Sequence, residues 1–273
     1  MIHPMYLVIL ADGRTPQRPL VGGLPVAFQP TSDGRTPLER AVTRLAPLID
    51  PLDVVVVTER RHGQTVRGLV PGALVLTEPM HRNTAASIAL ATVALDRADD
   101  ETMLVVVPDH DIDRDDDLRD AITAADALFS AAGDDFESHL LAFAVTPTDP
   151  ESGLSYIRPR FGEAVRVDSL RVFAVDGYEA HPNATRAREL FDSGTAYSSA
   201  GIFLWRRSAI RAALERYTPL LTLIEPAYRS ELALAAAYDR LQPISIDEAV
   251  LAGAAGDGAV VTTPLDVGWR EIG

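Results

Sequence analysis

Apolar runs that alternate with helix-forming stretches are the feature that most constrains how this chain folds. Residues 5–10 and 103–107 are continuous apolar runs, which are typical of strands buried on both faces of a parallel sheet. The alternation predicts an α/β fold with a doubly wound, mostly parallel, Rossmann-like mixed sheet. Further strands are expected at 53–58, 73–76, 140–145, 165–175 and 202–205, and helices at 37–45, 62–69, 85–97, 118–129, 183–191, 210–217 and 232–241.

The size and composition of the chain indicate one domain with a large core. It has 273 residues, of which 47% are hydrophobic, and this is enough for a single domain over 1–273. No apolar run reaches the roughly 18 residues of a membrane-spanning helix, so no membrane partner is expected. The N-terminus lacks the basic start of a signal peptide and the chain has no Cys, so a cytoplasmic location is predicted.

The charge of the chain excludes some partners and restricts the chemistry. A net charge of −14 argues against binding to nucleic acid or to an anionic membrane surface. All 25 basic residues are Arg, because the sequence contains no Lys. Any site for an anionic ligand must therefore rely on Arg, on backbone N–H groups or on a metal ion.

The segment from Glu78 to Thr84 joins an apolar run to a helix-forming stretch. Asn83 and Thr84 are good helix N-cap residues, so the segment is expected to be a loop that opens onto a helix N-terminus. Open α/β sheets bind ligands at the carboxyl ends of their strands, and free N–H groups at a helix start favour anions. The same spacing also fits an ordinary strand–loop–helix joint, which α/β domains contain repeatedly.

The residues of this segment are more specific than its spacing. The text E-P-x-x-R-N-T-A-x-x-I-A-L-A closely resembles a motif of mannose-1-phosphate guanylyltransferases, members of the sugar-nucleotidyltransferase family. That family joins a nucleoside triphosphate to a sugar 1-phosphate. The resemblance implies the nucleotide-diphospho-sugar transferase type of α/β fold, with GTP and a sugar 1-phosphate as ligands. It also implies nucleotide contacts by Glu78, Arg82, Asn83 and Thr84.

The loop after the first strand resembles the family's Gly-rich triphosphate loop, but it lacks one Gly and departs at two further positions. Asp12 stands where the family has Gly, and Pro16 stands where the family has an Arg that contacts phosphate. A plain strand-to-loop turn is the alternative interpretation. The family's P-K-Q-F-like segment, whose Lys contacts phosphate, has no basic residue here. The residues that the resemblance leaves for the triphosphate are Ala11, Asp12, Gly13, Arg14 and Arg18, with the two arginines as the catalytic cations.

Two carboxylates match the metal ligands of the family. Asp109 follows the apolar run 103–107 in a segment that resembles P-A-D-H-x-I, and Glu271 occupies the second metal position of D-x-G-W-x-D-x-G. The resemblance implies that both bind Mg²⁺, and it makes Asp109 catalytic. A carboxylate at the carboxyl end of a strand suits a hard cation that keeps several waters.

The acidic residues that follow have a simpler interpretation. The alternation of Asp109, Asp111 and Asp113 resembles the start of a calcium loop, but Arg114 and Asp120 stand where such a loop needs Gly and Glu. Residues 115–117 are three more Asp at an expected helix start. Acidic side chains there complement the helix dipole, so this run is expected to be solvated.

The second half of the chain carries candidates for the sugar. Residues 146–157 resemble P-T-x-P-E-T-G-Y-G-Y-I, a family loop that contacts the sugar, although generic turn residues would give a similar text. Gly in this loop allows close approach of backbone to the ring. Ala180 stands where the family has a sugar-contacting Glu. The sugar contacts that the resemblance implies are Glu151, Gly153, His181 in place of Lys, Ser199 in place of Asn, and Asp247.

The resemblance implies a reaction in which a sugar 1-phosphate oxygen attacks the α-phosphorus of GTP and pyrophosphate leaves. Such catalysis rests on positioning and on charge stabilisation by Mg²⁺ and cations. Because both family lysines, the loop Arg and one Glu are absent, the alternative is an inactive relative that binds a nucleotide or sugar nucleotide, or a partner subunit. The C-terminal extension usual in the family is expected to be absent, and a homodimer is left open.

Overall fold

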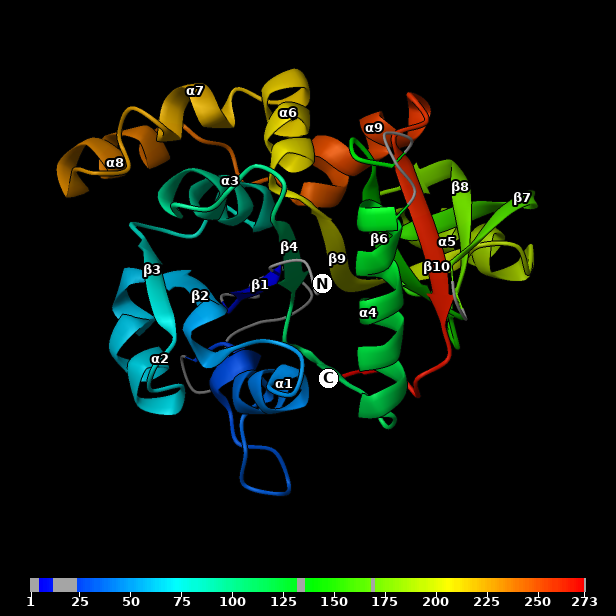
Figure 1. Cartoon of the computed structure of the whole chain (residues 1–273), viewed down its shortest axis with the longest axis horizontal. Helices are drawn as coiled ribbons and strands as arrows, with labels where there is room; N and C mark the ends of the chain where they lie inside the picture. The colour runs from blue at the N-terminus through cyan, green and yellow to red at the C-terminus, as the bar shows by residue number, and fades with distance from the viewer. Residues whose placement is uncertain (1–4, 12–23, 132–135, 168–169, 273) are drawn as a thin grey trace.

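The computed structural model describes residues 5–11, 24–131, 136–167 and 170–272, and its centre is a nine-stranded mixed sheet with helices on both faces (Figure 1). The strand order is β3-β2-β1-β4-β9-β6-β10-β8-β7, and β5 pairs with β11 in a separate small sheet. The strands are β1 Met5–Leu10, β2 Val54–Glu59, β3 Leu74–Glu78, β4 Thr102–Val106, β5 His110–Asp111, β6 Leu140–Val145, β7 Tyr156–Val167, β8 Leu170–Glu179, β9 Tyr197–Arg206, β10 Val260–Leu265 and β11 Arg270–Glu271.

Helices cover the sheet in two layers, as the alternation in the sequence predicts. The α-helices are α1 Pro37–Leu45, α2 Gly63–Leu69, α3 Thr84–Ala94, α4 Asp115–Ala131, α5 Ala184–Asp192, α6 Arg207–Tyr217, α7 Leu220–Ile224, α8 Glu231–Asp239 and α9 Ala252–Gly256. Helices α3, α6, α7 and α8 pack on one face, and α1, α2 and α4 pack on the other. None of the helices in the described ranges is long and apolar enough to cross a membrane.

Strand β1 shows why the sheet is buried on both faces. Tyr6, Val8 and Leu10 belong to the core on the α3 side, while Leu7 and Ile9 belong to the core on the α1 side. This follows from the two-residue period of a strand, which sends successive side chains to opposite faces. A continuous apolar run is therefore what a central strand with helices on both sides requires.

The sheet is mixed because β9 and β8 each lie antiparallel to their neighbours. Strands β1 to β4 are parallel, but β9 lies antiparallel between β4 and β6. The first two residues of β9 also pair with β7, so that β9, β6, β10, β8 and β7 form a closed ring of pairings. Strands were expected at 165–175, but the hairpin of β7 and β8 extends beyond this range at both ends. Strand β7 begins at Tyr156, where its first two residues pair with β9, and β8 ends at Glu179.

Helix α1 begins as its sequence predicts. Thr36 is the N-cap, its hydroxyl accepts a hydrogen bond from the Glu39 N–H (3.2 Å), and the Glu39 carboxylate accepts one from the Thr36 N–H (2.7 Å). Pro37 occupies the first helical position, where no N–H is needed. Helix α3, in contrast, ends at Ala94 and not at residue 97, since Leu95 is extended.

Replacing Thr36 by Ala is expected to lower the free energy of unfolding by about 1 kcal/mol, since the cap of α1 is lost. The measurement is urea denaturation followed by circular dichroism. Thr36→Ser retains the hydroxyl and serves as the control, with an expected loss of less than half that of Ala. Equal stability of the Ala variant and the natural protein would contradict the role of this cap.

Candidate functional site

The carboxyl ends of β1 to β4 meet at one edge of the sheet, and the first predicted site residues follow them. Ile9 lies opposite Val106, and Leu10 lies opposite Val57. Ala11 is buried there and its N–H donates to the Val57 carbonyl (2.9 Å). Asp12, Gly13, Arg14 and Arg18 lie outside the described residues, so their predicted triphosphate contacts stay predictions.

The loop between β3 and α3 is fastened to a distant segment of the chain. Asn83, in a left-handed conformation with φ of 66°, caps α3 by accepting from the Thr84 N–H (2.7 Å). The Thr84 hydroxyl accepts from the Ile246 N–H (2.8 Å), and the Arg82 carbonyl accepts from the Ile244 N–H (3.2 Å). These bonds bring the predicted nucleotide loop next to the segment that leads into the predicted sugar residue at position 247.

The side chains of Glu78 and Arg82 hold this loop against the end of α8. The Glu78 carboxylate is fully buried and accepts from the Ser87 hydroxyl (2.7 Å) and the Tyr238 hydroxyl (2.9 Å). Burial, followed by the nearby Glu78 charge, raises the pKa of Tyr238 well above that of an ordinary tyrosine. The Arg82 guanidinium donates to the Tyr238 carbonyl (2.8 Å). Both residues thus support the loop, and the nucleotide contacts predicted for them stay predictions.

The two predicted metal ligands lie on adjacent backbone segments. Strand β5 follows Asp109, and it pairs antiparallel with β11 so that Glu271 lies opposite His110. The Ile272 N–H donates to the Asp109 carbonyl (2.9 Å). The Asp109 residue is 8% exposed, and its carboxylate lies 3.9 Å from the His110 imidazole. Residues from opposite halves of the chain are therefore brought together just beyond the end of β4.

This donor set fits a metal ion that arrives with phosphates. Mg²⁺ is commonly held by one or two carboxylates, with waters and substrate phosphate oxygens as the other ligands. Asp109 and Glu271 supply two carboxylates at one edge of the sheet. Within the described ranges no group of three or more His, Asp or Glu side chains is arranged to hold a metal by itself. The residues thus suit a shared metal site and not an all-protein cage.

Tyr178 connects two of the predicted sugar residues, and sequence reasoning missed it. Its hydroxyl donates to the Asp247 carboxylate (2.5 Å) and lies 3.3 Å from the Ser199 hydroxyl. The available signal was its place in the sequence, two residues before Ala180 and three before His181, the two positions that the resemblance matches to a Glu and a Lys. Burial, followed by the Asp247 charge, raises the pKa of Tyr178 well above its ordinary value.

Two other residues predicted to bind the sugar, Gly153 and His181, contact each other. The His181 imidazole is 3.0 Å from the Gly153 carbonyl, and His181 has a left-handed φ of 43°. Glu151 lies two residues before Gly153 in the same loop and is partly exposed. The structure therefore joins Ser199 to Asp247 and Gly153 to His181, and the sugar contacts predicted for all five residues stay predictions.

The buried tyrosines predict a loss of stability in alkali. Because the folded pKa values of Tyr178 and Tyr238 are raised, the stability they contribute is complete below about pH 10 and falls as the pH rises above the unfolded value. Tyr178→Phe removes one ionisable group, so its free energy of unfolding is expected to fall less steeply between pH 9 and about 11. Urea denaturation across this range measures the slope, with Tyr228→Phe as the control for losing a partly exposed hydroxyl.

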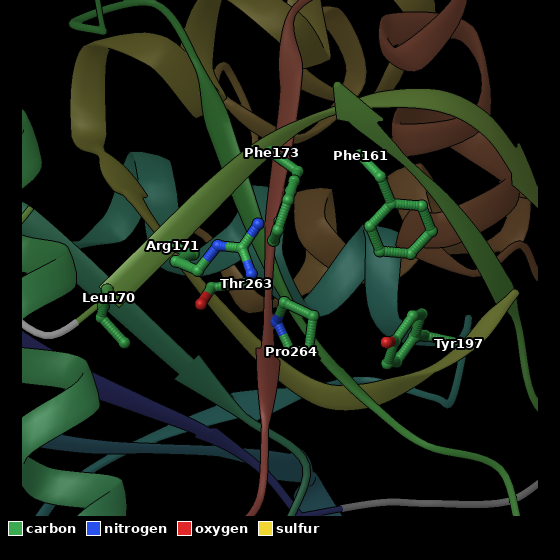
Figure 2. Close-up of a pocket in the computed structure, with 7 residues that line it drawn as sticks. All are labelled: Phe161, Leu170, Arg171, Phe173, Tyr197, Thr263 and Pro264. Atoms are coloured by element: carbon green, nitrogen blue, oxygen red, sulfur yellow. The ribbon is translucent and has the colours of Figure 1, made fainter. Parts of the chain in front are cut away.

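A pocket of about 320 Å³ opens elsewhere on the sheet (Figure 2). The Arg171 guanidinium lies over the Phe173 ring at 5.1 Å, and the Phe161 ring contacts Phe173 edge to face. None of the predicted site residues within the described ranges lines this pocket. The lining residues come from β7, β8, the start of β9 and β10 and are Phe161, Leu170, Arg171, Phe173, Tyr197, Thr263 and Pro264.

Comparison with known proteins finds relatives that are about 30% identical to this chain. The chain is 33% identical over 217 residues to a mannose-1-phosphate guanylyltransferase of Sinorhizobium fredii, which covers 76% of the chain and 39% of that protein. It is 31% identical to a mannose-1-phosphate guanylyltransferase of Escherichia coli, over 73% of the chain and 42% of that protein. It is 29% identical to the xanthan biosynthesis protein XanB of Xanthomonas campestris, over 91% of the chain and 53% of that protein. The chain thus spans about half or less of these relatives, and no model of a known protein family matches it.

Solved structures share the whole architecture. A Thermus thermophilus protein described as a mannose-1-phosphate geranyltransferase superposes with a TM-score of 0.76 at 25% identity, over 97% of this chain and 75% of that one. A Helicobacter pylori protein described as a mannose-6-phosphate isomerase also gives 0.76, at 21% identity, over 98% and 100%. The fold is therefore the Rossmann-like nucleotide-diphospho-sugar transferase fold, as predicted. The sequence identity to the relatives identifies the family as well as the fold: the chain belongs to the sugar-nucleotidyltransferase family.

Proposed function

We propose that the protein transfers a nucleotidyl group from GTP to mannose 1-phosphate, giving GDP-mannose and pyrophosphate. The observation that carries the proposal is the pairing of β5 with β11, which brings Asp109 and Glu271 to adjacent backbone segments beyond the end of β4. The names of the relatives support the choice of substrates. In the reaction an oxygen of the sugar phosphate forms a bond to the α-phosphorus of GTP, and the bond between the α- and β-phosphates breaks.

The chain's own residues would act mainly by positioning. Asp109 and Glu271 would hold Mg²⁺, which when bound neutralises charge on the phosphates. The loop that ends at Asn83, the N-cap of α3, would present the positive end of the α3 dipole to the nucleotide. Asp247, held by the Tyr178 hydroxyl, would accept hydrogen bonds from sugar hydroxyls. No side chain needs to act as a general base, because the attacking phosphate oxygen is already ionised.

The second candidate is an inactive relative that binds a nucleotide or sugar nucleotide. It is favoured by the way that arginines near the predicted site are used. Arg40, Arg44 and Arg270 are paired with carboxylates, and Arg82 donates to a backbone carbonyl. With no Lys in the chain and Pro16 in place of the loop Arg, few cations remain for the triphosphate, and Ala180 in place of a Glu removes a sugar contact. Arg14 and Arg18 are the candidates that would decide between the two functions.

Two assays separate the candidates. Calorimetric titration with GTP, with Mg²⁺ and then with EDTA, is expected to show binding that depends on the metal. Release of pyrophosphate from GTP and mannose 1-phosphate would then support the transferase, with ATP and glucose 1-phosphate as comparison substrates. GTP binding without pyrophosphate release would favour the inactive relative. A folded protein that binds no nucleoside triphosphate would contradict the transferase and leave a relative that binds a sugar nucleotide.

A further inference from the structure

The short strand that carries Glu271 is clamped by its neighbour Arg270. The Arg270 guanidinium donates to both carboxylate oxygens of Asp113 (2.6 and 2.7 Å), in the bidentate geometry that gives strong and directional pairs. It also reaches the Asp111 carboxylate (3.4 Å). We propose that Arg270 is a positioning residue, which fixes Glu271 beside Asp109 for metal binding through its pair with Asp113. This inference rests on the metal site of the proposed function.

Strand β11 needs such support because it is short. It has two residues, and in the part of the chain that the structure describes it pairs with β5 alone, which also has two. An isolated pair of strands is marginally stable at best in water, so main-chain bonds alone would leave this pair loose. Asp113 and Arg114 each donate an N–H to the Val267 carbonyl (3.0 Å). These bonds tie the segment just before β11 to the segment just after β5.

Asp113 is held in place from a second direction. Gly268 adopts a left-handed φ of 68°, and its backbone passes so close to Asp113 that an added Cβ would lie 2.6 to 2.9 Å from the Asp113 side chain. The turn at Gly268 and the guanidinium of Arg270 therefore enclose the Asp113 carboxylate between them. The hydrogen bond from Arg270 holds the pKa of Asp113 below its usual value, so the pair stays charged at neutral pH.

The pair of Arg270 and Asp113 is connected to helix α1 through Asp111. One oxygen of Asp111 accepts from Arg40 (3.1 Å), and its other oxygen faces Arg270. Arg44, also on α1, pairs with Asp115 at the start of α4 (2.6 Å). Arg270 thus joins a network of ion pairs that is braced by two helices, and such a network positions a strand better than an isolated surface pair does.

The positioning role and a purely electrostatic role predict opposite effects of removing Arg270. A guanidinium near a cation site repels the metal, so on charge alone Arg270→Ala would tighten metal binding. If Arg270 positions Glu271, the same variant loses one ordered ligand and binds the metal more weakly. Loss of an outer partner of a metal ligand commonly costs about 10- to 100-fold in affinity. The sign of the change therefore distinguishes the two roles.

The test is titration of the full chain with Mn²⁺, with free Mn²⁺ followed by electron paramagnetic resonance. Arg270→Ala is expected to raise the dissociation constant about tenfold or more, and Arg270→Lys, which keeps one bond to Asp113, by less. The matched control is Arg216→Ala, which breaks an exposed pair of similar length with Asp257 (2.7 Å) at the far side of the sheet and is expected to change nothing. The Tm of each variant shows that it is folded.

Comparison with Glu271→Gln completes the design. Positioning predicts that the double variant Arg270→Ala/Glu271→Gln binds Mn²⁺ no more weakly than Glu271→Gln alone, because the clamp acts through that carboxylate. Equal or tighter binding by folded Arg270→Ala would overturn the inference and leave the metal site intact. If Glu271→Gln and Asp109→Asn both bind Mn²⁺ as the natural protein does, the metal site of the proposed function fails, and the inference fails with it.

Discussion

Replacing Asp109 by Asn is expected to reduce pyrophosphate release from GTP and mannose 1-phosphate by at least about 10²- to 10³-fold. A preorganised charge that stabilises the transition state commonly contributes this much. The amide keeps the size of the side chain and removes the negative charge that would hold Mg²⁺. Asp109 is nearly buried just beyond the end of β4, so its carboxylate has a fixed place in the site.

The measurement is the initial rate of pyrophosphate release at saturating Mg²⁺, repeated at tenfold higher metal. The matched control is Asp126→Asn, which makes the same change at a buried aspartate on α4 and is expected to keep the natural rate. Higher metal is expected to restore only part of the Asp109→Asn activity, since the ligand itself is missing. A folded Asp109→Asn variant with the natural rate would show that the reaction does not use this carboxylate.

Much of the fold could be predicted because its signals are local. The apolar run at 5–10 matches β1 in full, and its two-sided burial is what the run implies. The Thr36, Pro37 and Glu39 pattern fixes the start of α1 within one turn of helix. Where a strand depends on a distant partner, its own sequence gives a weaker signal for a strand. Strand β7 contains Arg158 and Pro159, and its full length becomes clear only from its pairing with β8 and β9.

Site residues could be predicted only where they match a family motif, because the contacts of the site join distant parts of the chain. Asp109 and Glu271 come together through two strands of two residues each, which no periodicity can reveal. Tyr178 meets Asp247 for the same reason, from two elements far apart in sequence. Arg270 was part of the motif that identified Glu271, yet its own partner, Asp113, appeared only as one of a run of acidic residues. Sequence thus indicates which residue types are present, and tertiary pairing decides what they do.

Replacing Glu78 by Ala is expected to have the largest effect on stability near the site, a loss of about 3 kcal/mol in the free energy of unfolding. The fully buried carboxylate accepts hydrogen bonds from Ser87 and Tyr238. Truncation leaves the two buried hydroxyls with only long contacts, from Ser87 to the Asn83 carbonyl (3.4 Å) and from Tyr238 to the Ala86 carbonyl (3.5 Å). A buried group that loses its good acceptor costs about 1–3 kcal/mol. Since Arg82 donates to the carbonyl of Tyr238, the loop from 79 to 83 loses its support at the same point, so weaker GTP binding is also expected.

Urea denaturation and calorimetric GTP titration measure the two effects, and three variants separate their causes. Glu78→Gln keeps one carbonyl oxygen as acceptor and is expected to lose about 1 kcal/mol. Tyr238→Phe removes one donor, so the double variant Glu78→Ala/Tyr238→Phe is expected to be more stable than the sum of the two single losses predicts. Additive losses would show that the two side chains act independently. A Glu78→Ala variant that is destabilised but binds GTP normally would show that the loop does not depend on this carboxylate, and that the nucleotide is held from elsewhere.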